Sequence, residues 1–134
     1  MNSLSPYLMH NLIFGISLLL LDTFFIYSVI LKKYLSLFTK LNLKIDIKKN
    51  NIICAIITYI ILISSFYLIY NQNPNTMILN SIILGLAIYG TYAFTLATIL
   101  PYYDIYYALL DTLWGVVLFT LSTIASIFIY RNLL

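Results

Sequence analysis

Residues 52–70 read IICAIITYIILISSFYLIY, an uncharged apolar run with about the 20 residues that an α-helix needs to cross a bilayer. The whole chain of 134 residues has the same character, since 63% of its residues are hydrophobic and only 8% are charged. In a soluble domain roughly a quarter of the residues are charged, and a disordered chain requires low hydrophobicity. The composition therefore predicts an integral membrane protein.

Three further apolar runs accompany this one, and short polar or proline-containing segments separate them. The chain is therefore predicted to be all-α, a polytopic membrane protein with a bundle of four transmembrane helices in a single domain, residues 1–134. The predicted spans cover residues 9–31, 52–70, 77–100 and 107–130.

Positive charge is concentrated in the loop between the first two spans, residues 32–51. Six of the seven basic residues lie there: Lys32, Lys33, Lys40, Lys44, Lys48 and Lys49. Lysines resist translocation, so this loop is predicted to be cytoplasmic, with the N- and C-termini on the opposite side of the membrane. Membrane lipids are the expected partners, and their headgroups are predicted to contact Lys32, Lys33, Lys48 and Lys49. Apolar residues at helical spacing after Lys33 predict that the first helix continues along the membrane surface. A platform of base-stacking aromatic residues is lacking, so no nucleic-acid partner is expected.

Two aspartates interrupt otherwise apolar spans, in LLLDTFF around Asp22 and in LLDTLW around Asp111. In each motif an aromatic residue follows the acid by three positions, Phe25 or Trp114, and so shares its helix face. An acid inside a membrane costs at least about 2.5–3.5 kcal/mol, which makes each aspartate a functional-site hypothesis. The topology places both in the same half of the membrane, and they would face one cavity if the first and fourth helices are neighbours.

The third span contributes a stripe of hydroxyl groups at helical spacing, formed by Thr91, Thr95 and Thr98. Together these residues predict an intramembrane polar site made of Asp22, Asp111, Thr91, Thr95, Thr98, Tyr89, Tyr92 and Trp114. The structural alternative is that each carboxyl group ties helices together through Thr or Tyr hydroxyls. Two aspartates and one distant histidine are too few for a metal site, so no metal or other cofactor is expected.

Three motifs, LLLDTFF at 19–25, IYGTYAFTLAT at 88–98 and ALLDTLWG at 108–115, together resemble a family of small four-helix membrane proteins from bacteria and some large DNA viruses. This family is known as domain of unknown function number twenty-one seventy-seven. The resemblance covers nearly the whole chain and implies the same helix order, but it implies no known activity. The matching residues are Asp22, Tyr89, Tyr92, Thr95, Leu96, Ala97, Thr98, Asp111, Trp114 and Gly115.

The chain departs from the family pattern in the third motif, where it has Ala93 in place of an aspartate and lacks the asparagine that follows Thr95. If all three acids served one activity, this copy would be altered or inactive. The abundance of Ile, Asn, Lys and Tyr indicates an AT-rich genome, which would suit a viral source.

Three functions remain open from the sequence. The first is a proton or cation channel or transporter that uses the intramembrane aspartates, working as a homo-oligomer if it forms a pore. The second is a structural or assembly subunit of a membrane complex, whose acids seat it against a partner. The third is an intramembrane enzyme with a lipid-like substrate and two acids as general acid and base. The sequence does not favour an enzyme, because it has no His–Cys–Ser constellation, no HExxH motif and no phosphate-binding glycine loop.

Overall fold

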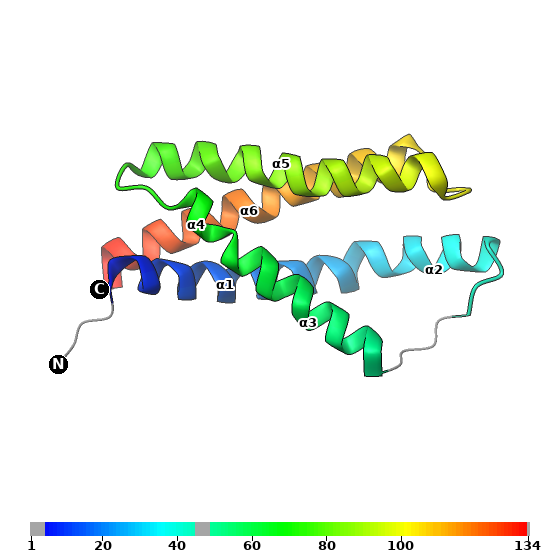
Figure 1. The fold of residues 1–134 in the computed structure, drawn as a ribbon, viewed down its shortest axis with the longest axis horizontal. Coiled ribbons are helices and arrows are strands. Elements are labelled where there is room, and N and C mark those ends of the chain that lie inside the picture. The colour runs from blue at the N-terminus through cyan, green and yellow to red at the C-terminus, as the bar shows by residue number, and fades with distance from the viewer. Residues whose placement is uncertain (1–4, 45–48, 134) are drawn as a thin grey trace.

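A computed structural model describes residues 5–44 and 49–133, and these residues are almost entirely helical (Figure 1). The elements are α1 (Pro6–Phe25), a π-helical turn η1 (Ile26–Ile30), α2 (Leu31–Lys40), α3 (Lys49–Ser64), α4 (Phe66–Ile69), α5 (Pro74–Ile99) and α6 (Ile105–Leu133). Strands are absent from the described part of the chain. Four stretches are long and apolar enough to cross a membrane: Pro6–Lys40, Asn51–Ile69, Pro74–Ile99 and Ile105–Asn132. The predicted all-α fold with four transmembrane helices is confirmed.

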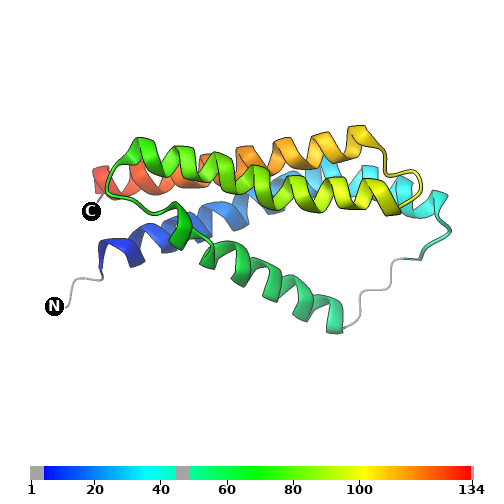
Figure 2. The same cartoon turned by 45° about the horizontal axis from the view of Figure 1, so that its top comes forward.

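The helices form a bundle built around α6. Helices α5 and α6 pack side by side along most of their length, and α1 packs on another side of α6 (Figures 1 and 2). Helix α3 starts away from the bundle and approaches α1 toward its C-terminal end, as both views show.

Helix starts are set by capping residues that the sequence supplies. Ser5 precedes Pro6 and its side chain accepts a hydrogen bond from the Leu8 N–H at 3.4 Å. Asn73 precedes Pro74 and accepts from the Asn75 N–H at 3.0 Å. A polar cap followed by proline in the first turn is a common way to begin a helix, because proline lacks an N–H that would be unsatisfied there.

The first helical rod is longer than the predicted span 9–31, because α1, η1 and α2 run continuously from Pro6 to Lys40. The predicted continuation of the helix after Lys33 is thus confirmed as far as Lys40. Helix α2 also does not lie apart from the bundle, since Leu37 is 1% exposed and packs in a buried cluster with Ala93, Tyr103 and Ala108. The apolar face of α2 packs against residues of α5 and α6, and the burial of this apolar surface holds α2 against them.

The lysines of the basic segment are placed only in part. Lys32 and Lys33 are exposed on α2. Lys48 lies outside the described residues, and of Lys49 only the backbone, at the start of α3, is described. The predicted lipid contacts of these four residues stay predictions.

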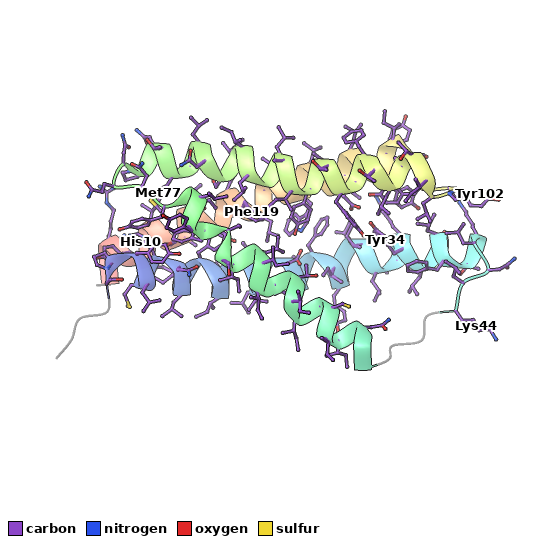
Figure 3. The ribbon with its side chains drawn as sticks, in the orientation of Figure 1. His10, Tyr34, Lys44, Met77, Tyr102 and Phe119 are labelled. Atoms are coloured by element: carbon purple, nitrogen blue, oxygen red, sulfur yellow. The ribbon has the colours of Figure 1, made fainter. Side chains whose placement is uncertain are left out.

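The larger core cluster lies toward the end of the bundle that carries the termini, around Phe14, Leu18, Phe66 and Phe119, all fully buried. Figure 3 shows Phe119 and Met77 within this end of the bundle. Further along, Gly85 and Gly115 bring α5 and α6 into close contact: a Cβ atom added at Gly85 would lie 2.6 Å from the Gly115 carbonyl oxygen. Small residues allow this approach.

Candidate intramembrane polar site

Asp111 lies in the second turn of α6 and is 8% exposed. Its Oδ2 accepts a hydrogen bond from the Tyr34 hydroxyl at 2.6 Å and another from the Tyr103 hydroxyl at 2.5 Å. Tyr34 comes from α2, and Tyr103 comes from the connector between α5 and α6. Figure 3 shows Tyr34 projecting from α2 toward the α5–α6 pair. One carboxylate therefore joins three parts of the chain.

The connector directs Tyr103 inward through an unusual backbone conformation at its neighbour. Tyr102 has φ 67°, in the left-handed region, which costs a residue other than glycine roughly 1–2 kcal/mol. Tyr102 is 61% exposed, whereas Tyr103 is 2% exposed and reaches Asp111. Burial, and then the hydrogen bond to Asp111, raise the pKa of Tyr103 above its ordinary value, so this phenol stays protonated and acts as a donor.

Asp22 lies on α1 and is likewise 8% exposed. Its Oδ2 accepts from the Tyr59 hydroxyl of α3 at 2.7 Å, and its Oδ1 accepts from the Trp114 indole N–H of α6 at 3.0 Å. Trp114 stacks on Phe25, with ring centroids 3.8 Å apart and planes 8° from parallel. The two sequence motifs therefore meet through their aromatic residues. Trp114 shares a helix with Asp111 but donates its N–H to the acid of the other helix, a contact that the sequence did not predict.

The π-helical turn η1 explains how Asp22 and Tyr34 face the same region. Twelve residues separate them, and at about 100° per residue a regular α-helix would set their side chains about 120° apart. A π-turn takes one more residue than an α-turn, and one residue corresponds to about 100° of rotation. The turn from Ile26 to Ile30 therefore brings Tyr34 to within about 20° of Asp22 around the rod axis.

Both aspartates line one cavity of about 360 Å³ that is open on one side. Helices α1 and α6 are neighbours, which is the condition under which a shared cavity was expected. The remaining lining residues are Phe25, Ile26, Ile30, Leu31, Tyr34, Phe38, Tyr89, Tyr92 and Trp114. Of the predicted site residues, Asp22, Asp111, Tyr89, Tyr92 and Trp114 are thus brought together at this cavity.

The threonine stripe lies elsewhere. Thr91, Thr95 and Thr98 are exposed, and Thr91 and Thr95 line a second, shallow depression on the outside of α5, which shares only Tyr92 with the cavity of the aspartates. The reason is rotational: Ala93 is fully buried against the bundle, and Thr91 and Thr95, each two residues away, point about 200° from it around the helix. The Thr98 hydroxyl donates to the Thr95 carbonyl oxygen at 2.7 Å, within its own helix. The structure therefore separates the threonines from the carboxylates.

Three residues that bind the carboxylates were not among the predicted site residues: Tyr34, Tyr59 and Tyr103. The sequence carries a partial signal for Tyr59, which is a hydroxyl in the middle of the apolar run 52–70. Such a group inside a membrane needs a partner. The tyrosines at 34 and 103 sit in interfacial positions, where a Tyr is common without any specific partner.

A second buried polar pair lies at the end of the bundle that carries the termini, where Figure 3 labels His10. The Ser126 hydroxyl donates to the His10 carbonyl oxygen at 2.8 Å, and the same hydroxyl oxygen lies 2.8 Å from His10 Nδ1. Because the hydroxyl proton is used on the carbonyl oxygen, Nδ1–H must donate to the hydroxyl. This pair fixes α1 against α6.

Comparison with protein families gives one match. A family model described as "Predicted membrane protein (DUF2177)" matches residues 7–128, nearly the whole chain. No curated protein and no solved structure matches the chain.

Proposed function

The chain belongs to the DUF2177 family of predicted membrane proteins, and we propose that it is a membrane transport protein whose proton or cation site is the cavity shared by Asp22 and Asp111. The observation that carries the proposal is that carboxylates from two neighbouring helices line the same cavity. Acids inside membrane helices are expensive and mark ion pathways and proton relays more often than not.

The hydrogen bonds of the site support this reading. All four donors to the carboxylates are neutral groups, three phenols and one indole. Such donors hold a carboxylate in place but leave its negative charge uncompensated. A proton or a cation that enters the cavity would compensate that charge, and its release would restore it.

The position of the site in the membrane follows from the basic segment. We propose that the lysine-rich segment, residues 32–51, lies at the cytoplasmic side of the membrane, since lysines resist translocation. Asp111 is six residues into α6, or about 9 Å from the start of the helix at about 1.5 Å per residue. The site therefore belongs to the cytoplasmic half of the membrane, within reach of water on that side.

The proposal is tested by flux into proteoliposomes. Purified wild type, Asp111→Asn and Asp22→Asn would be reconstituted with a fluorescent indicator for the tested ion inside the liposomes, under an imposed gradient of that ion, H⁺, Na⁺ or K⁺. Asparagine at position 111 keeps one oxygen for both phenols, which end on the same Asp111 oxygen, so their hydrogen bonds are retained while the charge is lost. Asparagine at position 22 keeps only one of the two accepting oxygens, so Asp22→Asn also loses a hydrogen bond. We expect flux in the wild type and its loss in Asp111→Asn.

The matched control is Asp104→Asn. Asp104 is exposed, lies outside the cavity, and caps α6 by accepting from the N–H groups of Tyr106 and Tyr107; asparagine caps helices equally well. This variant should carry wild-type flux. Equal flux in all four proteins, or none in the wild type with any cation, would refute a transport site at the two aspartates.

A role as an assembly subunit is favoured by one separate observation, the exposure of α3. Every side chain from 51 to 58 is exposed, and six isoleucines between 52 and 61 are each at least 45% exposed. In a membrane this face contacts lipid or another chain. Cys54 is exposed on this face and is the single cysteine of the chain. If α3 joins two copies, copper-phenanthroline oxidation in membranes should give a covalent dimer that Cys54→Ser abolishes.

A further inference from the structure

We propose that the cation taken up by the cavity is a small organic ammonium, a positively charged nitrogen that carries apolar groups; this rests on the proposed function and names its substrate class. The proposal rests on two carboxylates that line a cavity whose other lining residues are mainly aromatic. Six of the eleven lining residues are aromatic: Phe25, Tyr34, Phe38, Tyr89, Tyr92 and Trp114. Aromatic faces together with a carboxylate form the usual environment of a bound ammonium group.

The composition of the wall argues for an organic cation over an inorganic one. Inorganic cations such as Ca²⁺ and Mg²⁺ require about six or more oxygen ligands, from protein or retained water. Apart from the two carboxylates, the phenol groups and the Trp114 indole N–H, this cavity is lined by carbon, including Ile26, Ile30 and Leu31. No cluster of three or more His, Cys, Asp or Glu side chains occurs among the described residues. An alkylated ammonium is shielded by its own carbon groups and gains contacts from the same wall.

The hydrogen bonds indicate where the charge would lie. Both phenols that bind Asp111 end on its Oδ2, so the lone pairs of Oδ1 remain for a ligand, since each carboxylate oxygen accepts more than one contact. Asp22 already uses both oxygens, one on Tyr59 and one on Trp114. The ammonium group is therefore assigned to Asp111, with its apolar part against the Phe25–Trp114 side of the cavity.

The size of the cavity limits the ligand. Small-molecule sites range from about 300 to 1,000 Å³, and this cavity, about 360 Å³, lies near the lower end. A ligand with one aromatic or short alkyl group on the nitrogen fits such a volume. Benzyltrimethylammonium is a suitable probe, and neopentylbenzene is its neutral isostere, with carbon in place of the charged nitrogen.

The protein carries its own reporter for this test. Trp114 is the single tryptophan of the chain, and it lines the cavity. Purified protein in lipid nanodiscs would be titrated with each probe while tryptophan fluorescence is recorded. We expect a saturable change with benzyltrimethylammonium and none with neopentylbenzene. In Asp111→Asn the affinity should fall by about tenfold or more, whereas Asp104→Asn should bind like the wild type.

The outcomes separate this inference from the proposed function. An equal response to the neutral isostere, or undiminished affinity in Asp111→Asn, would overturn the inference, and the comparison of the two probes needs no variant. Proton or Na⁺ flux that depends on Asp111, without any saturable response to benzyltrimethylammonium, would overturn the inference and leave the transport proposal standing. Saturable, charge-dependent binding without flux of protons, Na⁺, K⁺ or benzyltrimethylammonium itself would support the binding site and overturn transport.

Discussion

Replacement of Tyr34 by phenylalanine removes one hydroxyl group and tests whether Asp111 is held as an anion. Tyr34 is half-buried, and its hydroxyl donates to Asp111 Oδ2 at 2.6 Å. Hydrogen bonds between membrane helices contribute about 0.6 kcal/mol on average and up to about 1.7 kcal/mol. Bonds to an ionised group are about twice as strong as neutral ones. We therefore expect Tyr34→Phe to lower the free energy of unfolding by about 1.5 kcal/mol.

The same substitution in an Asp111→Asn background isolates the effect of the charge. There the phenol donates to a neutral amide oxygen, and its loss should lower the free energy of unfolding by only about 0.6 kcal/mol. The double-mutant cycle should thus give a coupling energy of about 1 kcal/mol between the hydroxyl and the negative charge.

The assay is equilibrium unfolding in mixed micelles, followed by the fluorescence of Trp114. The matched control is Tyr106→Phe: Tyr106 is 78% exposed and close in sequence to the site, so this change should stay within about 0.5 kcal/mol. A coupling energy near zero, with Tyr34→Phe no more destabilising than Tyr106→Phe, would refute the reasoning that Tyr34 binds an ionised Asp111.

Two further predictions concern the packing of α6. Gly115→Ala should lower the free energy of unfolding by about 1–3 kcal/mol, because a Cβ atom at this position would collide with the start of the Tyr89 side chain. The control is Gly90→Ala, where the nearest atom is Thr112 Cγ2 at 3.5 Å, and this change should leave stability unchanged or raise it. Thermal unfolding of both variants checks this, and a Gly115→Ala variant as stable as Gly90→Ala would contradict it. Ser126→Ala should lower the free energy of unfolding by about 1–3 kcal/mol, since it leaves His10 Nδ1–H buried without its partner. The same unfolding assay applies, with Ser64→Ala at an exposed serine as the control. Equal melting temperatures of the two variants would show that the His10–Ser126 pair does not stabilise the fold.

The fold could be predicted because its main determinant is local. Each apolar run spans a bilayer by itself, and turns with Pro74 and Pro101 separate the last three runs. The continuation of the first helix beyond Lys33 was predicted from its apolar spacing. Its contact with the bundle was not predicted, because that contact depends on distant partners, here the cluster around Leu37 and Tyr103.

The site could be predicted only for residue types whose burial in a membrane is energetically unfavourable, because these stand out in an apolar sequence. A carboxylate in an apolar run is such a case, and Asp22 and Asp111 do line one cavity. Of the four donors only Trp114 was among the predicted site residues; Tyr34 and Tyr59 reach the carboxylates from 77 and 37 positions away in the chain. The π-turn that rotates Tyr34 has no signature in IYSVI. The threonine stripe has the right spacing but lies on the wrong face of α5, since spacing defines a face without fixing which side it meets.

Ala93 is the position where the chain departs from the family pattern, and it lies on α5. Ala93 is fully buried, in the same cluster as Tyr103, whose hydroxyl binds Asp111. An aspartate there would add a third carboxyl group to this buried cluster. In this chain the four donors to Asp22 and Asp111 come from Tyr34, Tyr59, Tyr103 and Trp114, and none comes from position 93. The alanine therefore leaves all four hydrogen bonds that hold Asp22 and Asp111 intact.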